Sequence, residues 1–114
     1  HRGDRMNFRQ MADRIGFSED EFMELVALFL ESSLAELDHI NAAAKEMDFG
    51  RMAMCAHSIR GAAINLGFEE IHALAKAIEG NARANELNGT IEAAERIKDN
   101  LEQIVGTMVL SGRH

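Results

Sequence analysis

The sequence predicts an all-α protein, and three observations carry the prediction. The 114 residues include no proline, tryptophan or tyrosine, and few are β-branched, which leaves little material for strands. Alanine, leucine, glutamate and methionine, which favour helices, are abundant. Apolar residues recur with the helical period of about 3.6 residues over four long segments. Because the connections between these segments are short, we expect an antiparallel up-down-up-down four-helix bundle with a short extra N-terminal helix.

Length and charge narrow the class of protein further. A chain of this length fits one domain, which we expect to span residues 1–114. The net charge of -7 argues against a nucleic-acid binder, which needs a basic face to displace counterions from phosphates. No apolar run approaches the ~18 residues of a membrane-spanning helix. With a single cysteine, Cys55, we expect neither an internal disulfide nor a cysteine-based zinc site.

The first two helices follow from periodicity and end signals. An amphipathic stretch predicts a short helix over residues 4–15 that ends at Gly16. Ser18 and Glu21 then form the pattern of a capping box, in which each side chain pairs with the backbone N–H of the other. A helix is therefore predicted over residues 19–46.

The remaining three helices are bounded in the same way. Asp48 is a plausible N-cap for a helix over 49–66, and Gly67 lies where a left-handed C-terminal residue belongs. A third long helix is predicted over 69–86, before the break at Asn88-Gly89. We expect Thr90 to cap the last helix, over 91–109.

The helix over 49–66 differs from its neighbours because its outward face carries almost no charge. Arg51 and Arg60 are its only charged residues. At about 100° per residue, His57 points almost directly away from the apolar core stripe. That core stripe comprises Met52, Cys55, Ile59, Ala62, Ala63 and Leu66. On the outward face, Met54, Ser58, Gly61, Ile64 and Asn65 lie around His57; we call these five residues the docking face, because an exposed apolar patch usually marks a docking surface.

Gly61 and Arg60 make the surroundings of His57 more specific. A glycine inside a helix costs about 1 kcal/mol relative to alanine, and Gly61 lies one turn beyond His57 on the same face. Its missing side chain leaves the imidazole accessible to a bulky partner. Arg60 can bring a cation towards an anion bound at that imidazole. This combination predicts a histidine that accepts a phosphoryl group. The alternative interpretation is an ordinary exposed histidine on a helix that packs against something else.

The segment from Ala56 to Gly67 resembles the signature of the histidine-containing phosphotransfer (HPt) domains of multistep two-component phosphorelays. It is also similar to the phosphotransfer domain of chemotaxis kinases. The matching residues are His57, Gly61, Ala62, Ala63 and Gly67, and Arg60 stands where the family has lysine. The likeness extends to Phe29-Leu30 and to the run through Leu74, Glu79 and Ala82-Arg83. Arginine keeps the charge of lysine but contacts phosphate with a different shape.

The resemblance implies a function for the whole chain. His57 would accept a phosphoryl group from an aspartyl phosphate on a receiver domain and pass it to the aspartate of another. Arg60 and Gly61 would lie near the phosphate, the docking face would bind the receivers, and Gly67 would be structural. The chain would be a phosphocarrier without kinase activity or nucleotide binding, and no glycine-rich phosphate loop is present. It would hold no cofactor, since the receiver would bring Mg²⁺.

The sequence also leads to expectations for the cellular location, the partners and an alternative function of the chain. We expect a cytoplasmic monomer, either free-standing or part of a larger hybrid sensor histidine kinase anchored in a membrane; the start at His1 slightly favours a domain cut from a longer protein. The chain would contact receiver domains of response regulators or of a hybrid kinase, and neither nucleic acid nor the membrane directly. The alternative function is a bundle that docks a partner through the same helix without being phosphorylated.

Two Glu-x-x-His pairs raise the possibility of a metal site of the kind found in ferritin-like bundles. They are Glu36 with His39 and Glu69 with His72. In the predicted bundle Glu36 lies about 25 Å along its helix at about 1.5 Å per residue, whereas Glu69 opens a parallel helix. The pairs cannot share a metal, so we expect none. Cys55 is predicted to be a small buried hydrophobic residue rather than a nucleophile.

Overall fold

The chain is all-helical, as predicted. In the computed structural model, which describes residues 7–111, the chain forms five helices and no strand within that range. They are α1 (Phe8–Arg14), α2 (Glu19–Lys45), α3 (Phe49–Leu66), α4 (Glu69–Arg83) and α5 (Thr90–Ser111). No helix among the described residues has the length and apolar character required to cross a membrane.

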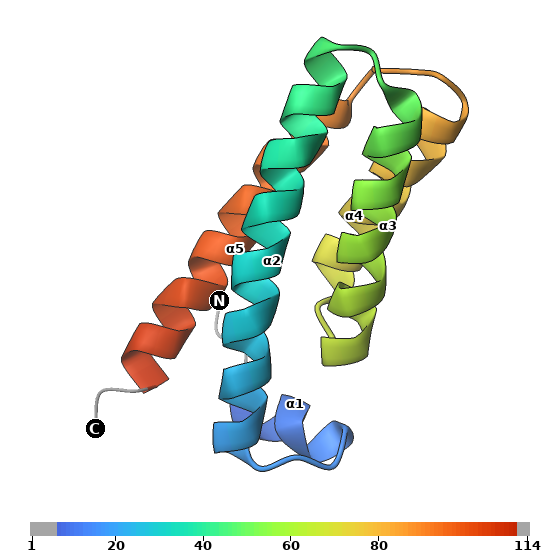
Figure 1. Ribbon diagram of the computed structural model, residues 1–114. Helices are drawn as coiled ribbons and strands as arrows, with labels where there is room; N and C mark the ends of the chain where they lie inside the picture. Colours follow the sequence, from blue (N-terminus) through green and yellow to red (C-terminus); the bar gives the residue numbers. More distant parts are fainter. Residues whose placement is uncertain (1–6, 112–114) are drawn as a thin grey trace.

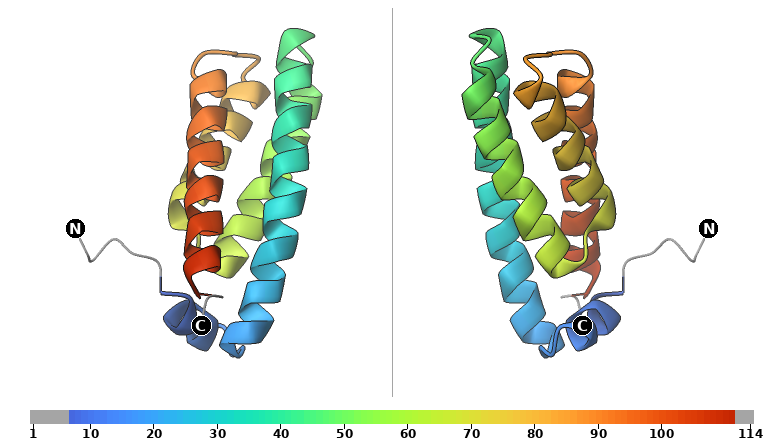
Figure 2. Two further views of the ribbon diagram at one scale, coloured as in Figure 1. Left: turned by 90° about the vertical axis from the view of Figure 1, so that its left-hand side faces the viewer. Right: turned by 90° about the vertical axis from the view of Figure 1, so that its right-hand side faces the viewer.

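The four long helices lie side by side, and each runs opposite to the one before it (Figure 1). α3 packs between α2 and α4, and α5 packs against both α4 and α2. The short α1 crosses the end of the molecule where α2 begins and packs against α2, as the two views in Figure 2 also show. The phosphotransfer signature therefore lies on a helix that has a neighbour on each side.

Local end signals explain where α2 and α3 begin and where α3 ends. Ser18 Oγ accepts a hydrogen bond from the Glu21 backbone N–H at 3.1 Å, and Glu21 Oε1 accepts one from the Ser18 N–H at 2.9 Å, so the predicted capping box is present. Asp48 Oδ1 accepts from the Arg51 N–H at 3.1 Å, which confirms it as the N-cap of α3. Gly67 ends α3 with a φ of 90°, in the left-handed region that glycine adopts without a steric cost.

Several predicted boundaries differ from the structure. Two of the differences are small: α2 ends at Lys45 rather than at residue 46, and α5 ends at Ser111 rather than at residue 109. α4 ends at Arg83 rather than at residue 86, because Asn85 adopts a left-handed φ of 59° and turns the chain out of the helix. Thr90 is the first residue of α5 rather than its cap, since its buried hydroxyl has no hydrogen-bond partner among the described residues. The first helix spans only Phe8–Arg14 of the predicted 4–15, and residues 4–6 lie outside the described range.

The core fixes the rotation of α3 about its axis. Ile59 and Ala63 are almost completely buried against the neighbouring helices, and Ala56 is fully buried beside them. Most of the predicted core stripe is buried, including Cys55 at 8% exposure, which agrees with its prediction as a buried residue. With these residues facing inward, the side of α3 that carries His57 must face solvent.

Candidate functional site

His57 lies on the outward side of α3, and 61% of its side chain is exposed. All five residues of the docking face are exposed as well. The two large apolar members, Met54 and Ile64, are exposed to 71% and 46%. These residues therefore lie on the exposed side of α3, around an accessible imidazole.

A buried carboxylate from the neighbouring helix lies behind the imidazole. Glu79 of α4 has a side chain that is only 6% exposed, and its Oε2 lies 3.0 Å from His57 Nδ1. Arg60 donates from Nη1 to Glu79 Oε1 at 2.7 Å. Arg83 donates to Glu79 Oε2 from Nη2 at 2.8 Å and from Nε at 3.2 Å. One carboxylate thus connects the imidazole to two guanidinium groups.

The surroundings of Glu79 keep it ionised. Burial by itself would raise the pKa of this carboxyl group, but hydrogen bonds from Arg83 and His57 and the charge of Arg60 outweigh burial and lower the pKa below its usual value. The two arginines and one carboxylate leave a net charge of +1 beside His57. A positive local charge favours the approach of a phosphoryl group.

The contact with Glu79 also determines which nitrogen of His57 can react. An ionised carboxylate only accepts hydrogen bonds, so the proton of a neutral imidazole is assigned to Nδ1. Nε2 then carries a free lone pair on a largely exposed ring. This arrangement provides a nucleophilic nitrogen whose ring orientation is fixed from behind.

Arg60 lies beside His57 as expected but makes a contact that the sequence did not predict. Its guanidinium forms an ion pair with Glu79, and its side chain is 35% exposed. Its backbone carbonyl lies 3.2 Å from His72 Nδ1, a nitrogen that can donate to it. A phosphate contact by Arg60 stays a prediction, and the structure adds a role in the ion-pair network.

Glu79 is the site residue that the sequence analysis missed, although it belongs to the stretch of α4 that resembles the family. A signal was available, because Glu79 lies four residues after Ala75 and three before Ala82, both on the inward stripe. A carboxylate on the buried side of a helix requires partners, and the arginines meet that requirement.

A groove between α2 and α3 opens beside the docking face. Its lining is mainly apolar and comes from both helices: Leu25, Leu28, Phe29, Glu31, Ser32, Ala35, Ala62, Asn65 and Leu66. Leu28 is 63% exposed. Asn65 belongs both to this groove and to the docking face, so the apolar surface continues from α3 onto α2.

The two glycines of the signature should respond oppositely to alanine. A Cβ at Gly61 would meet nothing within 4 Å, so Gly61→Ala should raise the free energy of unfolding by about 0.5–1 kcal/mol. Gly67 has a φ of 90°, and Gly67→Ala should lower it by about 1 kcal/mol or more. Urea unfolding followed by circular dichroism measures both, and destabilisation by Gly61→Ala would show that the space beside His57 is not open.

The family assignment follows from comparison with known proteins. The family model described as Hpt domain matches residues 24–107. The chain belongs to the Hpt domain family. The match covers His57, Arg60, Glu79 and Arg83, all of which lie within this range. Neither the comparison with curated proteins nor the comparison with solved structures gave a match.

Membership sets the general role of the chain. Hpt domains are helical bundles that act as phosphocarriers, not kinases, in two-component signalling, and they interact with receiver domains. This Hpt domain places an exposed histidine, a buried carboxylate and two arginines at one point on its surface.

Proposed function

We propose that this Hpt domain carries a phosphoryl group on His57, which it accepts from an aspartyl phosphate of one receiver domain and passes to the aspartate of another. The observation that supports the proposal most strongly is the 3.0 Å contact between Glu79 Oε2 and Nδ1 of the exposed His57. This contact orients the ring and leaves Nε2 free to attack phosphorus.

The transfer step follows from this geometry. The Nε2 lone pair attacks the phosphorus atom, an N–P bond forms, and the bond from phosphorus to the aspartyl oxygen breaks, so a carboxylate leaves on the donor receiver. The ring keeps its proton on Nδ1 and acquires positive charge, which Glu79 stabilises from behind. The reverse sequence delivers the phosphoryl group to the next aspartate. The receiver supplies the acidic pocket and Mg²⁺, so the domain needs no cofactor of its own.

The docking face provides the surface on which the receivers bind. Its apolar residues and the groove beside Asn65 favour a partner with a complementary apolar surface. Gly61 leaves room next to the imidazole, and Arg60 lies near the incoming phosphate. One surface used in succession by two receivers requires no second copy of the chain, which favours a monomer.

The scaffold and setting complete the proposal. An antiparallel up-down-up-down four-helix bundle of α2 to α5 forms the single domain, and α1 closes one end. The domain works in the cytoplasm, free-standing or within a hybrid sensor kinase. The exposed apolar docking face also suits a second function, in which the bundle binds a partner without being phosphorylated.

A transfer assay separates the two functions. Receiver domains phosphorylated by a small phosphodonor are mixed with the chain, and intact mass and acid lability are measured. We expect one phosphoryl group per chain, lost in acid as an N–P bond is. Binding of a receiver without any transfer would support the interaction-only function, and neither binding nor transfer with any receiver of a broad panel would contradict both.

A further inference from the structure

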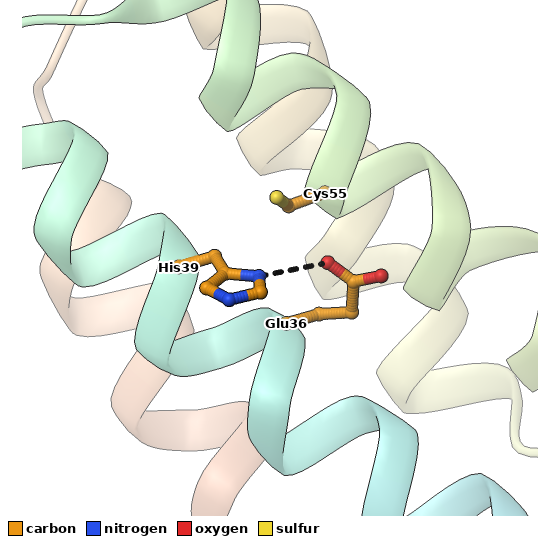
Figure 3. Close-up of side chains that lie close together, drawn as sticks. All are labelled: Glu36, His39 and Cys55. Carbon is orange, nitrogen blue, oxygen red and sulfur yellow. Dashed lines mark ion pairs between the residues drawn. The ribbon is translucent and has the colours of Figure 1, made fainter.

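A second cluster of reactive side chains lies at the interface of α2 and α3, apart from the Glu79 network. Glu36 and His39 of α2 point towards one another, and Cys55 of α3 points towards both (Figure 3). One ligand atom from each residue can be chosen so that all three lie within 4.8 Å of one another. Glu36 Oε1 is 3.7 Å from His39 Nδ1.

We propose that Glu36, His39 and Cys55 form a binding site for Zn²⁺ that links α2 to α3. The three residues offer a carboxylate oxygen, an imidazole nitrogen and a sulfur. This mixed set suits a borderline cation such as Zn²⁺, whereas Mg²⁺ and Ca²⁺ prefer oxygen ligands alone. Three protein ligands leave the fourth tetrahedral position to water.

The geometry requires only small movements. Zn–O, Zn–N and Zn–S bonds of about 2.0–2.3 Å place tetrahedral ligands about 3.3–3.7 Å apart. Glu36 Oε1 and His39 Nδ1, which are 3.7 Å apart, need to approach by about 0.3 Å, and the sulfur, within 4.8 Å of a ligand atom of each, needs to approach by at most about 1.3 Å. His39 is 52% exposed and Glu36 29% exposed, which leaves their side chains free to adjust and open to an ion from solvent.

The charge of Glu36 supports a cation at this place. Its carboxylate lies close to the His39 imidazole and the Cys55 sulfur, so negative charge faces the cluster. When Zn²⁺ binds, it takes the place of the thiol proton, which leaves to solvent. The sequence analysis expected no metal because it compared the two Glu-x-x-His pairs with one another; the structure instead brings a sulfur to the first pair.

Cobalt titration of the full chain tests the site, because thiolate bound to Co²⁺ gives a charge-transfer band and the chain has one cysteine. We expect the band to saturate at one Co²⁺ per chain and to disappear on addition of Zn²⁺. Cys55→Ala should abolish it. His39→Gln and Glu36→Gln should each weaken binding at least about tenfold, since even residues that only support ligands are worth that much.

Matched variants make the test specific. His72→Gln, from the other Glu-x-x-His pair, and His57→Gln should leave Co²⁺ affinity unchanged, so the result is independent of phosphotransfer. Zn²⁺ should raise the melting temperature of the parent chain but not of Cys55→Ala, because a ligand that binds the folded state stabilises it. An absent band, unchanged binding in His39→Gln, or one metal shared between two chains would each overturn the proposal.

Discussion

Replacing His57 by glutamine should abolish phosphoryl transfer to the chain while leaving the helices intact. Glutamine has no nitrogen lone pair that can attack phosphorus, so no N–P bond can form. The side chain of His57 is 61% exposed, and the glutamine amide can still donate to Glu79, so the packing of α3 is unaffected. The measurement is intact mass after incubation with a phosphorylated receiver, with circular dichroism as the test of folding.

Two other histidines serve as controls for this substitution. His39→Gln and His72→Gln remove imidazoles from α2 and α4 and should accept the phosphoryl group as the parent does. An acid-labile phosphoryl group on His57→Gln would place the acceptor elsewhere. Loss of receiver binding together with loss of transfer would show that His57 is part of the docking surface itself.

Glu79→Gln should slow phosphoryl transfer by up to about 100-fold, because it disturbs the orientation of the reacting ring. In the parent, one carboxylate oxygen accepts from Arg60 and the other accepts from both His57 and Arg83. A glutamine has one acceptor oxygen, so its NH₂ group must face either Arg60 or the His57 and Arg83 pair as a donor. Single-turnover transfer rates measure the effect.

Glu69→Gln is the matched control, since it removes an exposed carboxylate from the same helix. It should transfer at the parent rate. Equal rates for the parent and Glu79→Gln would remove Glu79 from the proposed mechanism and leave it a purely structural residue.

Glu79→Gln should also change how the free energy of unfolding depends on pH. The pKa of Glu79 is lower in the folded state than its ordinary value of 4.5. Its ionised carboxylate therefore contributes fully to the stability of the fold above about pH 4.5, and this contribution is lost as the pH falls through the folded pKa. At neutral pH the free energy of unfolding of the parent should exceed that of Glu79→Gln by about 1.5–3 kcal/mol, the range for hydrogen bonds to charged groups. Urea unfolding should show this difference shrinking below about pH 4; a difference that persists unchanged in acid would contradict it.

The fold could be predicted from the sequence wherever the information is local. Ser18, Asp48 and Gly67 act within one turn of the backbone, and each ended or began a helix as expected. The end of α4 was missed because residues 81–87, which lead up to Asn88, contain neither glycine nor proline. There the chain leaves the helix through Asn85, which has a left-handed conformation. Asparagine also occurs inside helices, so its presence in the sequence does not by itself mark a helix end.

The site was predictable only in the part that one helix determines. Helical periodicity placed His57 and the docking face on the exposed side of α3. The partner of His57 depends on how α3 and α4 are rotated and aligned, and a single helix pattern does not contain that information. The approach of Cys55 to Glu36 and His39 depends in the same way on α2 and α3.

The order in which the helices pack has a consequence for folding kinetics. Apart from the closure of α2 on α5, each substantial contact joins helices that follow one another in the chain. Such local topology keeps contact order low, and helical proteins of this kind fold in microseconds to milliseconds. With no proline and one cysteine, the chain also lacks prolyl isomerisation and disulfide exchange within the molecule, the common causes of slow refolding phases. The domain should therefore recover its native state rapidly after unfolding, with the docking of α5 onto α2 as the step that must wait for the longest loop to close.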